Sequence, residues 1–437
     1  MLKSLFRHSS WNAVATFSHQ GSTFVSNFLV IKLLDHVTYG KFSLVTLTAF
    51  YAANVLQFAI GLTASKFVAR YVADDDRLRS AIWVCGVFTF ASGLVGFAIL
   101  ALSSAILARS VFIEPSLTWP LTVVSLSVPG LIGMVFLGGL LQGLHEFRAL
   151  AISSMLSGLL FVVIMAAGAW MDGLIGAIWG FVAGSTIRCM IMGGATMLAL
   201  RSVVIGRSVS WRKVRSEMSE EILRFQIPAG LAGFITLPTL WLIPTILTRS
   251  TQNFSDVALY SVIFMLKSLV VIPASVISLA LQPSAEKACA LDQFEEATRI
   301  FRASSLAAFA FATVAALFVA ICAQKVLTVL GQSFAVAAFE LQLMMIAAVA
   351  EATAVSLYMR IQATGRMWGS IFATLLPRDL TMLFIVTAFA ASYGLRAAIV
   401  AHVAGATVNL IGVYWLSVKA VGRLGLSSGT VQSSRLS

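Results

Sequence analysis

Five ionisable residues interrupt otherwise apolar stretches of this chain. They are Arg188, Lys267, Glu351, Arg378 and Asp379. Charged side chains inside long apolar segments are costly, and they usually face a polar interior or one another. Arginine binds anionic groups through bidentate, charge-assisted hydrogen bonds, whereas lysine supplies a compact point charge. Because Arg188 and Lys267 have no obvious partner, the sequence favours a role for them in a cationic cavity.

Glu351 and Arg378 are expected to lie at similar depths. They stand 13 and 14 residues on either side of Thr364, near the tip of a turn between two apolar runs. If these runs form a helical hairpin, we expect the two side chains to form an ion pair. Pro377 lacks a backbone donor and predicts a kink beside them, while Asp379 projects about 100° round the helix from Arg378. Whether such a pair locks two helices or contacts a ligand stays open.

Uncharged polar residues add further candidates for binding. One helical face of the first apolar run is formed at three- and four-residue steps by Asn12, Thr16, His19, Thr23 and Ser26 or Asn27. Gln20 in the same run and Asn54 in the next run are counted with them. A water-filled cleft is favoured for the first run, and hydrogen bonding between helices is the alternative. For a second set, both interpretations stand equally: Ser261, Ser268, Ser275 and Gln282.

The elements that must position these residues are membrane-spanning helices. The chain has 437 residues, of which 59% are hydrophobic and 11% charged, and its mean hydropathy is +0.92. Long apolar windows with short connectors are typical of an all-α polytopic membrane protein. Twelve spans are predicted, at 11–34, 42–64, 80–107, 117–143, 150–171, 173–200, 224–248, 256–283, 302–323, 335–360, 367–390 and 394–418.

The distribution of basic residues predicts the orientation. With a cytoplasmic N-terminus, 21 Lys and Arg residues fall on the inner side and 6 on the outer side. The positive-inside rule therefore places both termini in the cytoplasm. The net charge of +12 then reflects topology and anionic lipid, so no nucleic-acid partner is needed. The four cysteines are scattered without metal-ligand spacing, and neither a metal nor a cofactor is expected.

The chain divides into two halves that resemble one another. "GLIGAIWGFVAGSTIR" (173–188) and "GLRAAIVAHVAGATVN" (394–409) agree at 8 of 16 positions. "LQGLHEFRALAISS" (141–154) pairs with "IQATGRMWGSIFAT" (361–374) at nearly the same offset. We predict an N-terminal six-helix lobe (1–200), a basic amphipathic connector (201–223), a C-terminal six-helix lobe (224–420) and a cytoplasmic tail (421–437). Six spans in each half imply parallel lobes related by a pseudo-twofold axis along the membrane normal.

Four short stretches at the ends of spans give the sequence a family resemblance. They are "DHVTYGKFSLV", "GLTASKFVARYV", "LQGLHEFRALA" and "LQPSAEKACALDQFEEATRIFRAS". As a set they resemble the polysaccharide transporter, or O-antigen flippase, family. Its superfamily also includes multidrug and toxin extruders. The resemblance implies a two-lobed bundle in the bacterial inner membrane that flips undecaprenyl-diphosphate-linked oligosaccharide to the periplasmic leaflet, for O-antigen or exopolysaccharide synthesis.

The expected mechanism is alternating access, with Arg188, Lys267 and Arg378 attracting the diphosphate. Expected partners are the lipid-linked oligosaccharide, membrane lipids and the polysaccharide polymerase and chain-length machinery. The alternative is a cation-coupled exporter of drugs or small molecules from the same superfamily. An integral polymerase or ligase is disfavoured because the chain has no large outer loop. No GxxxxGK[ST] motif is present for ATP, and no catalytic constellation stands out, so we expect a protein that is not an enzyme.

Overall fold

The computed structural model describes residues 2–203, 211–290, 293–363 and 367–433. All regular structure in these ranges is helical. The chain forms two compact units, each with its own packing. The first comprises Met1–Trp241 with Gln252–Ala258, and the second comprises Leu242–Thr251 with Leu259–Ser437.

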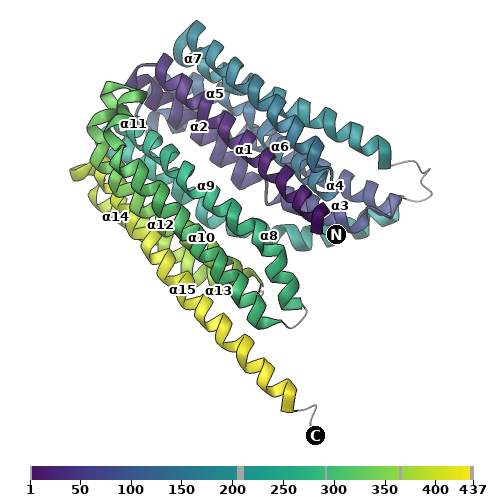
Figure 1. Cartoon of the computed structure of the whole chain (residues 1–437). Coiled ribbons are helices and arrows are strands. Elements are labelled where there is room, and N and C mark those ends of the chain that lie inside the picture. The colour runs from purple at the N-terminus through teal and green to yellow at the C-terminus, as the bar shows by residue number, and fades with distance from the viewer. Residues whose placement is uncertain (1, 204–210, 291–292, 364–366, 434–437) are drawn as a thin grey trace. The chain divides into compact units, whose positions relative to one another are not determined.

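The first unit contains the first half of the chain (Figure 1). Its elements are α1 (Leu2–Leu33), α2 (His36–Leu56), α3 (Ile60–Tyr71), α4 (Asp75–Ile106), the π-helix η1 (Leu107–Val111), the 3-10 helix η2 (Pro115–Leu117), α5 (Thr118–Ser125), α6 (Ser127–Gly143) and α7 (Phe147–Val203). Aspartates cap two of them: the Asp35 carboxylate accepts from the backbone N–H groups of Val37 and Thr38, and Asp74 accepts from that of Arg77.

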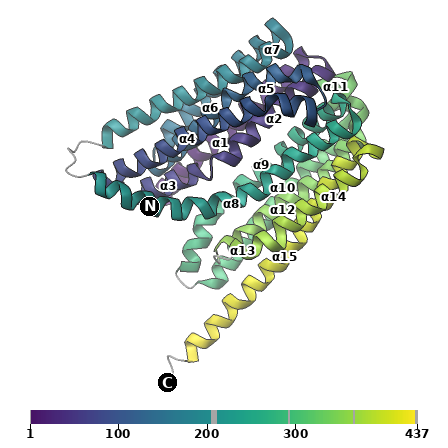
Figure 2. The same ribbon diagram turned by 180° about the vertical axis from the view of Figure 1, so that it is seen from behind.

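The second half continues with α8 (Trp211–Thr251), which begins in the first unit and ends in the second. The remaining elements are α9 (Phe254–Ala290), α10 (Phe294–Ile321), α11 (Ala323–Leu330), the 3-10 helix η3 (Gln332–Ala337), α12 (Ala338–Ala363), α13 (Met367–Ser370), the π-helix η4 (Ile371–Leu375), α14 (Leu376–Tyr393) and α15 (Leu395–Ser433). Figure 2 shows α12, α14 and α15 side by side in green and yellow.

The predicted all-α polytopic fold is confirmed. In the described part of the chain, eight helices are long and apolar enough to cross a membrane, and a ninth span is formed if α2 and α3 count together. Helix α7 is 57 residues long but reverses at Asp172 and Gly173, so it supplies two predicted spans. Helices α1 and α8 cover the predicted first and seventh spans.

The reversal in α7 has a counterpart in the second half. Gly173 has φ 52° and ψ −126°, and Gly394, between α14 and α15, has φ 50° and ψ −128°. These two glycines begin the matching sequences from which the duplication is predicted. L-residues with side chains rarely adopt this backbone conformation, so glycine permits the abrupt turn at both places. The two halves therefore repeat one turn at equivalent positions.

The second span was expected to be one continuous helix over 42–64, but the structure breaks it into two. Helices α2 and α3 are bent by 41° at residues 57–59. Phe58 and Ala59 have φ values of 43° and 55°, which are unusual for residues with side chains. The ring of Phe58 packs against the rings of Phe88 and Phe234, at centroid distances of 6.4 and 5.6 Å. Tertiary packing around Phe58 thus accompanies a break that local sequence does not signal.

The predicted kink near Pro377 takes the form of a π-helical turn. Helix η4 ends at Leu375, and Pro377 lies in the first turn of α14. Proline at this position cannot donate a backbone hydrogen bond to the carbonyl of Ala373, four residues earlier. That carbonyl oxygen lies against Gly412 of α15, where an added Cβ would overlap it. Gly412 thereby allows α15 to approach the turn closely.

The connector predicted at 201–223 lies partly outside the described residues, at 204–210. From Trp211 onward it belongs to α8 and continues directly into the predicted seventh span. The Glu221 carboxylate accepts from Arg70 Nη1 at 2.6 Å and from the Tyr71 hydroxyl at 2.9 Å. Lys66 Nζ lies 3.5 Å from the centroid of the Phe225 ring. These contacts fix the first turns of α8 to the end of α3.

Candidate functional site

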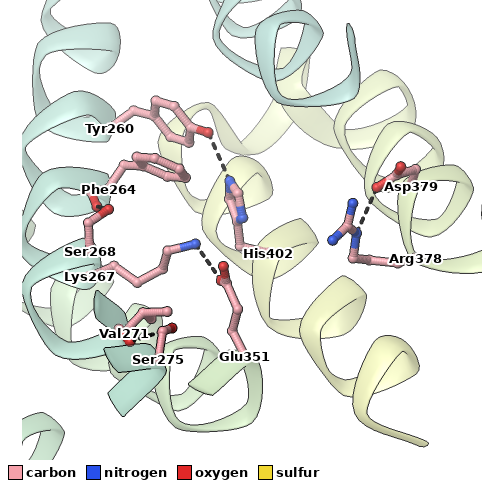
Figure 3. Close-up of polar contacts among 10 residues, drawn as sticks. All are labelled: Tyr260, Phe264, Lys267, Ser268, Val271, Ser275, Glu351, Arg378, Asp379 and His402. Atoms are coloured by element: carbon pink, nitrogen blue, oxygen red, sulfur yellow. Dashed lines mark hydrogen bonds and ion pairs between the residues drawn. The ribbon is translucent and has the colours of Figure 1, made fainter. Parts of the chain in front are cut away.

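Four helices of the second unit bring together a group of polar side chains, which we call the C-terminal cluster. It consists of Tyr260 and Lys267 from α9, Glu351 from α12, Arg378 and Asp379 from α14, and His402 from α15. Figure 3 shows His402 between the Lys267–Glu351 pair and the Arg378–Asp379 pair. Four of the five ionisable residues predicted from the sequence therefore gather in one place.

Lys267 and Glu351 form an ion pair across two helices. The distance from Lys267 Nζ to Glu351 Oε2 is 2.6 Å. The Lys267 side chain is 4% exposed and that of Glu351 is 38% exposed. Lys267 Nζ also lies 4.4 Å from the centroid of the Phe264 ring, one turn earlier on α9. The expectation that Lys267 lacks a partner, and that Glu351 pairs with Arg378, is therefore wrong.

Arg378 pairs instead with its neighbour in sequence. Its Nε donates to Asp379 Oδ1 at 2.7 Å. The side chains leave the helix about 100° apart, but the three methylene groups of arginine allow the guanidinium to turn back toward the carboxylate. Arg378 Nη2 is buried and has no hydrogen-bond partner among the described residues. The N–H groups of Arg378 Nη2 thus remain available to another acceptor.

His402 and Tyr260 complete the cluster, and sequence reasoning missed both. The Tyr260 hydroxyl and His402 Nε2 are 2.8 Å apart, and the two rings stack with a centroid distance of 5.7 Å. The predicted candidates of the second half were the Asp, Glu, Lys and Arg residues of the apolar runs, and His402 is not among these residue types. A signal was present, because Tyr260, Phe264 and Lys267 recur at helical spacing on one face of α9.

A second group, the N-terminal cluster, surrounds Arg188 of α7 in the first unit. Arg188 Nη2 donates to the Ser22 hydroxyl of α1 at 2.5 Å, and Nη1 lies 3.5 Å from both the Thr23 hydroxyl and His19 Nδ1. The guanidinium carbon lies 3.7 Å from the centroid of the Phe161 ring. Arg188 is 4% exposed. Contrary to expectation it has partners, and they join α7 to α1.

In the part of the chain that the structure describes, the other predicted candidates form no side-chain hydrogen bond with the charged residues of these clusters. Asn27 donates to the Thr23 carbonyl oxygen at 2.8 Å, and Asn54 donates to that of Phe50 at 2.8 Å, so both bond within their own helices. Asn54 also accepts from Gln57 at 2.9 Å, just before the break between α2 and α3. Gln20 Oε1 is buried without a hydrogen-bond partner among the described residues.

Most hydroxyl groups of the predicted polar faces are also satisfied within one helix. Thr16 donates to the Asn12 carbonyl oxygen and Thr23 to that of His19. On α9, Ser268 and Ser275 donate to the carbonyl oxygens of Phe264 and Val271. The side chain of Gln282 lies outside the described residues. The Thr23 hydroxyl, like that of Ser22, also contacts Arg188 and so links α1 to α7, whereas Thr16, Ser268 and Ser275 bond within one helix.

The C-terminal cluster has the groups needed to bind an anion without covalent chemistry. Lys267 and Arg378 supply N–H donors, and each of them binds a carboxylate. An anionic group of a ligand could accept the same hydrogen bonds. The N-terminal cluster instead surrounds its arginine with hydroxyl groups and an aromatic ring. The two halves therefore share a scaffold but carry different polar groups.

Comparisons with known proteins agree with this architecture. A family model described as "Polysaccharide biosynthesis protein" matches residues 5–289. No curated protein matches the chain. A multidrug resistance MATE family transporter of the MOP superfamily, solved in an inward-facing conformation, has a TM-score of 0.80 at 14% identity. The match covers 96% of this chain and 99% of that transporter.

A second similar structure is a MOP superfamily transporter from Pyrococcus furiosus, described as having a binding pocket of reverse polarity that suggests a different function. Its TM-score is 0.72 at 15% identity, and the match covers 97% of this chain and 96% of that one. At such low identity these structures show a shared transporter fold. The chain belongs to the polysaccharide biosynthesis protein family.

Proposed function

We propose that this protein is a flippase that moves undecaprenyl-diphosphate-linked oligosaccharide from the cytoplasmic to the periplasmic leaflet of the bacterial inner membrane. The observation that carries the proposal is the C-terminal cluster. It places the basic side chains of Lys267 and Arg378 and the imidazole of His402 together inside a membrane protein of the polysaccharide biosynthesis family. Buried basic groups suit the diphosphate of such a lipid better than a cationic drug.

In this proposal, transport proceeds by alternating access with both termini in the cytoplasm. Lys267 and Arg378 bind the diphosphate, while Arg188 contributes positive potential from the N-terminal cluster. Glu351 and Asp379 hold the two cations in place, and His19, Gln20, Asn27 and Asn54 are further candidates for contact with the cargo. The polyprenyl chain stays in the lipid, and the oligosaccharide serves O-antigen or exopolysaccharide synthesis, passing to the polymerase and chain-length machinery.

A second candidate is a multidrug or small-molecule exporter, which the likeness to MATE transporters favours. The two functions differ in their cargo and so in the defect that follows deletion. Loss of a flippase removes surface glycan, whereas loss of an exporter sensitises cells to toxic compounds.

Deletion of the gene tests the proposed function. In a strain without a redundant flippase, we expect lipid-linked glycan to stay on the cytoplasmic leaflet, protected from a glycosidase added to intact spheroplasts. Wild-type protein should restore surface glycan. The Lys267→Met variant should not, although the control variant Lys325→Met, changed at an exposed lysine of α11, should. Normal surface glycan after deletion, together with new drug sensitivity, would identify an exporter instead.

A further inference from the structure

The two partners of the Lys267–Glu351 ion pair differ sharply in exposure. The Lys267 side chain is almost fully buried at 4% exposure, whereas Glu351 is 38% exposed. A buried ammonium needs an anionic or polar partner in place, because desolvation without one is costly. The Glu351 carboxylate is less enclosed by protein, so it has room to turn away from Lys267. The pair is thus built so that the anion can be exchanged while the cation stays.

We propose that the Glu351 carboxylate is an internal substitute for cargo phosphate, occupying Lys267 when the site is empty and exchanging for an incoming diphosphate. This inference rests on the anionic cargo of the proposed function. The Glu351 carboxylate and a diphosphate cannot share Lys267 closely, because their like charges repel in a site of low dielectric constant. Binding therefore requires Glu351 to turn outward, and release is assisted when it returns.

The surroundings of Lys267 support its role as the fixed member of the pair. The Phe264 ring, 4.4 Å from Nζ, holds the ammonium by a cation–π contact that persists when Glu351 leaves. Arg378, on the other side of His402, offers its buried Nη2, which lacks a hydrogen-bond partner among the described residues. A diphosphate has enough oxygen atoms to accept from both cations, whereas the carboxylate of Glu351 serves one.

Binding of inorganic pyrophosphate and farnesyl diphosphate to the purified full-length protein tests the exchange. Glu351→Gln removes the negative charge and keeps an oxygen that accepts from Lys267. We expect this variant to bind both probes about tenfold more tightly, the equivalent of one charge-assisted hydrogen bond. Lys267→Met should weaken binding by a similar factor. In cells, Glu351→Gln should slow the appearance of surface glycan because release loses its competitor.

Two controls separate exchange from a general change in charge. Glu340 lies on α12, as Glu351 does, and pairs with Arg396 of α15 at 2.7 Å. Glu340→Gln removes this carboxylate and should leave probe affinity unchanged. In the Lys267→Met background, Glu351→Gln should have no further effect, because the two residues act on one ligand. Without ligand, the Tm of Glu351→Gln should fall below that of the wild type, and pyrophosphate should raise it more than it raises the wild-type Tm.

Equal affinity of Glu351→Gln and the wild type for pyrophosphate would overturn the exchange, as would an absence of binding in both. Unchanged affinity in Lys267→Met would overturn it as well. These outcomes differ from failure of the proposed function, which is measured by surface glycan in the deletion strain. Tighter probe binding by Glu351→Gln, combined with normal glycan after deletion, would keep the exchange and assign it to another anionic cargo.

Discussion

At the scale of single residues, the basic side chains of the two clusters have different kinds of partner. Lys267 and Arg378 each have a carboxylate partner, at 2.6 and 2.7 Å. Arg188 contacts hydroxyl groups, an imidazole and an aromatic ring, and no carboxylate among the described residues pairs with it. The desolvation of its charge is therefore not offset by an opposite charge, and burial of such a group is expensive. An arginine buried at this cost points to a role other than stability.

Arg188→Met should stabilise the protein and impair transport. The variant fills a similar volume without a buried charge, so we expect the free energy of unfolding to rise by about 1–2 kcal/mol. Thermal melting in detergent measures the stability and surface glycan measures the transport. Arg249→Met, at an exposed arginine near the end of α8, should leave the stability within about 0.5 kcal/mol. A lower Tm for Arg188→Met would instead show that its contacts with α1 outweigh the charge burial.

At the scale of elements, hydropathy was sufficient to predict a polytopic helical chain but not the internal breaks of its helices. The turn at Gly173 was predictable because glycine interrupts a long apolar run. The break at Phe58 and Ala59 was not, because both residues are ordinary helix constituents and the positive φ values come with tertiary packing. Likewise, a helical hairpin places Glu351 and Arg378 at similar depths in adjacent spans, whereas the partner of Glu351 is Lys267 of α9. Which non-adjacent helices pack together cannot be read from their order.

The contact between η4 and α15 gives a test at this scale. Gly412→Ala would place a methyl group on the Ala373 carbonyl oxygen, so the helices must separate. We expect a loss of about 1–3 kcal/mol, against the usual gain when alanine replaces glycine in a helix. Gly369→Ala is the matched control, because an added Cβ there meets no atom within 4 Å. A Tm for Gly412→Ala at or above that of Gly369→Ala would contradict the close packing.

At the scale of the whole molecule, the two halves share a turn of nearly identical geometry but carry different side chains. Gly173 and Gly394 turn with nearly identical torsion angles. None of the five charged residues within the apolar runs recurs at the matching position of the other half; for example, Arg188 corresponds to Asn409 and Lys267 to Ala49. His402 likewise corresponds to Phe181, which packs on Phe161. The two halves therefore place different polar groups at matching positions of the sequence.

The two turns should contribute independently to stability. Gly173→Ala and Gly394→Ala each force a side chain into a backbone conformation that favours glycine, and we expect a cost of about 1–3 kcal/mol each. Because the residues lie in separate compact units, the double variant should lose the sum of the two. Gly194→Ala, at a helical glycine with open space around it, should not destabilise the protein. A double variant markedly less or more stable than that sum would show coupling between the turns.

The two glycine turns give a reference point from which the position of an arginine in each half can be counted. Arg188 lies 15 residues after Gly173, and Arg378 lies 16 residues before Gly394. At about 1.5 Å per residue, each arginine stands roughly 23 Å along its helix from the turn of its own half. One belongs to the outgoing arm of its hairpin and the other to the incoming arm. Each half thus carries an arginine at a similar distance from its own glycine turn, although the two arginines do not occupy matching positions in the sequence.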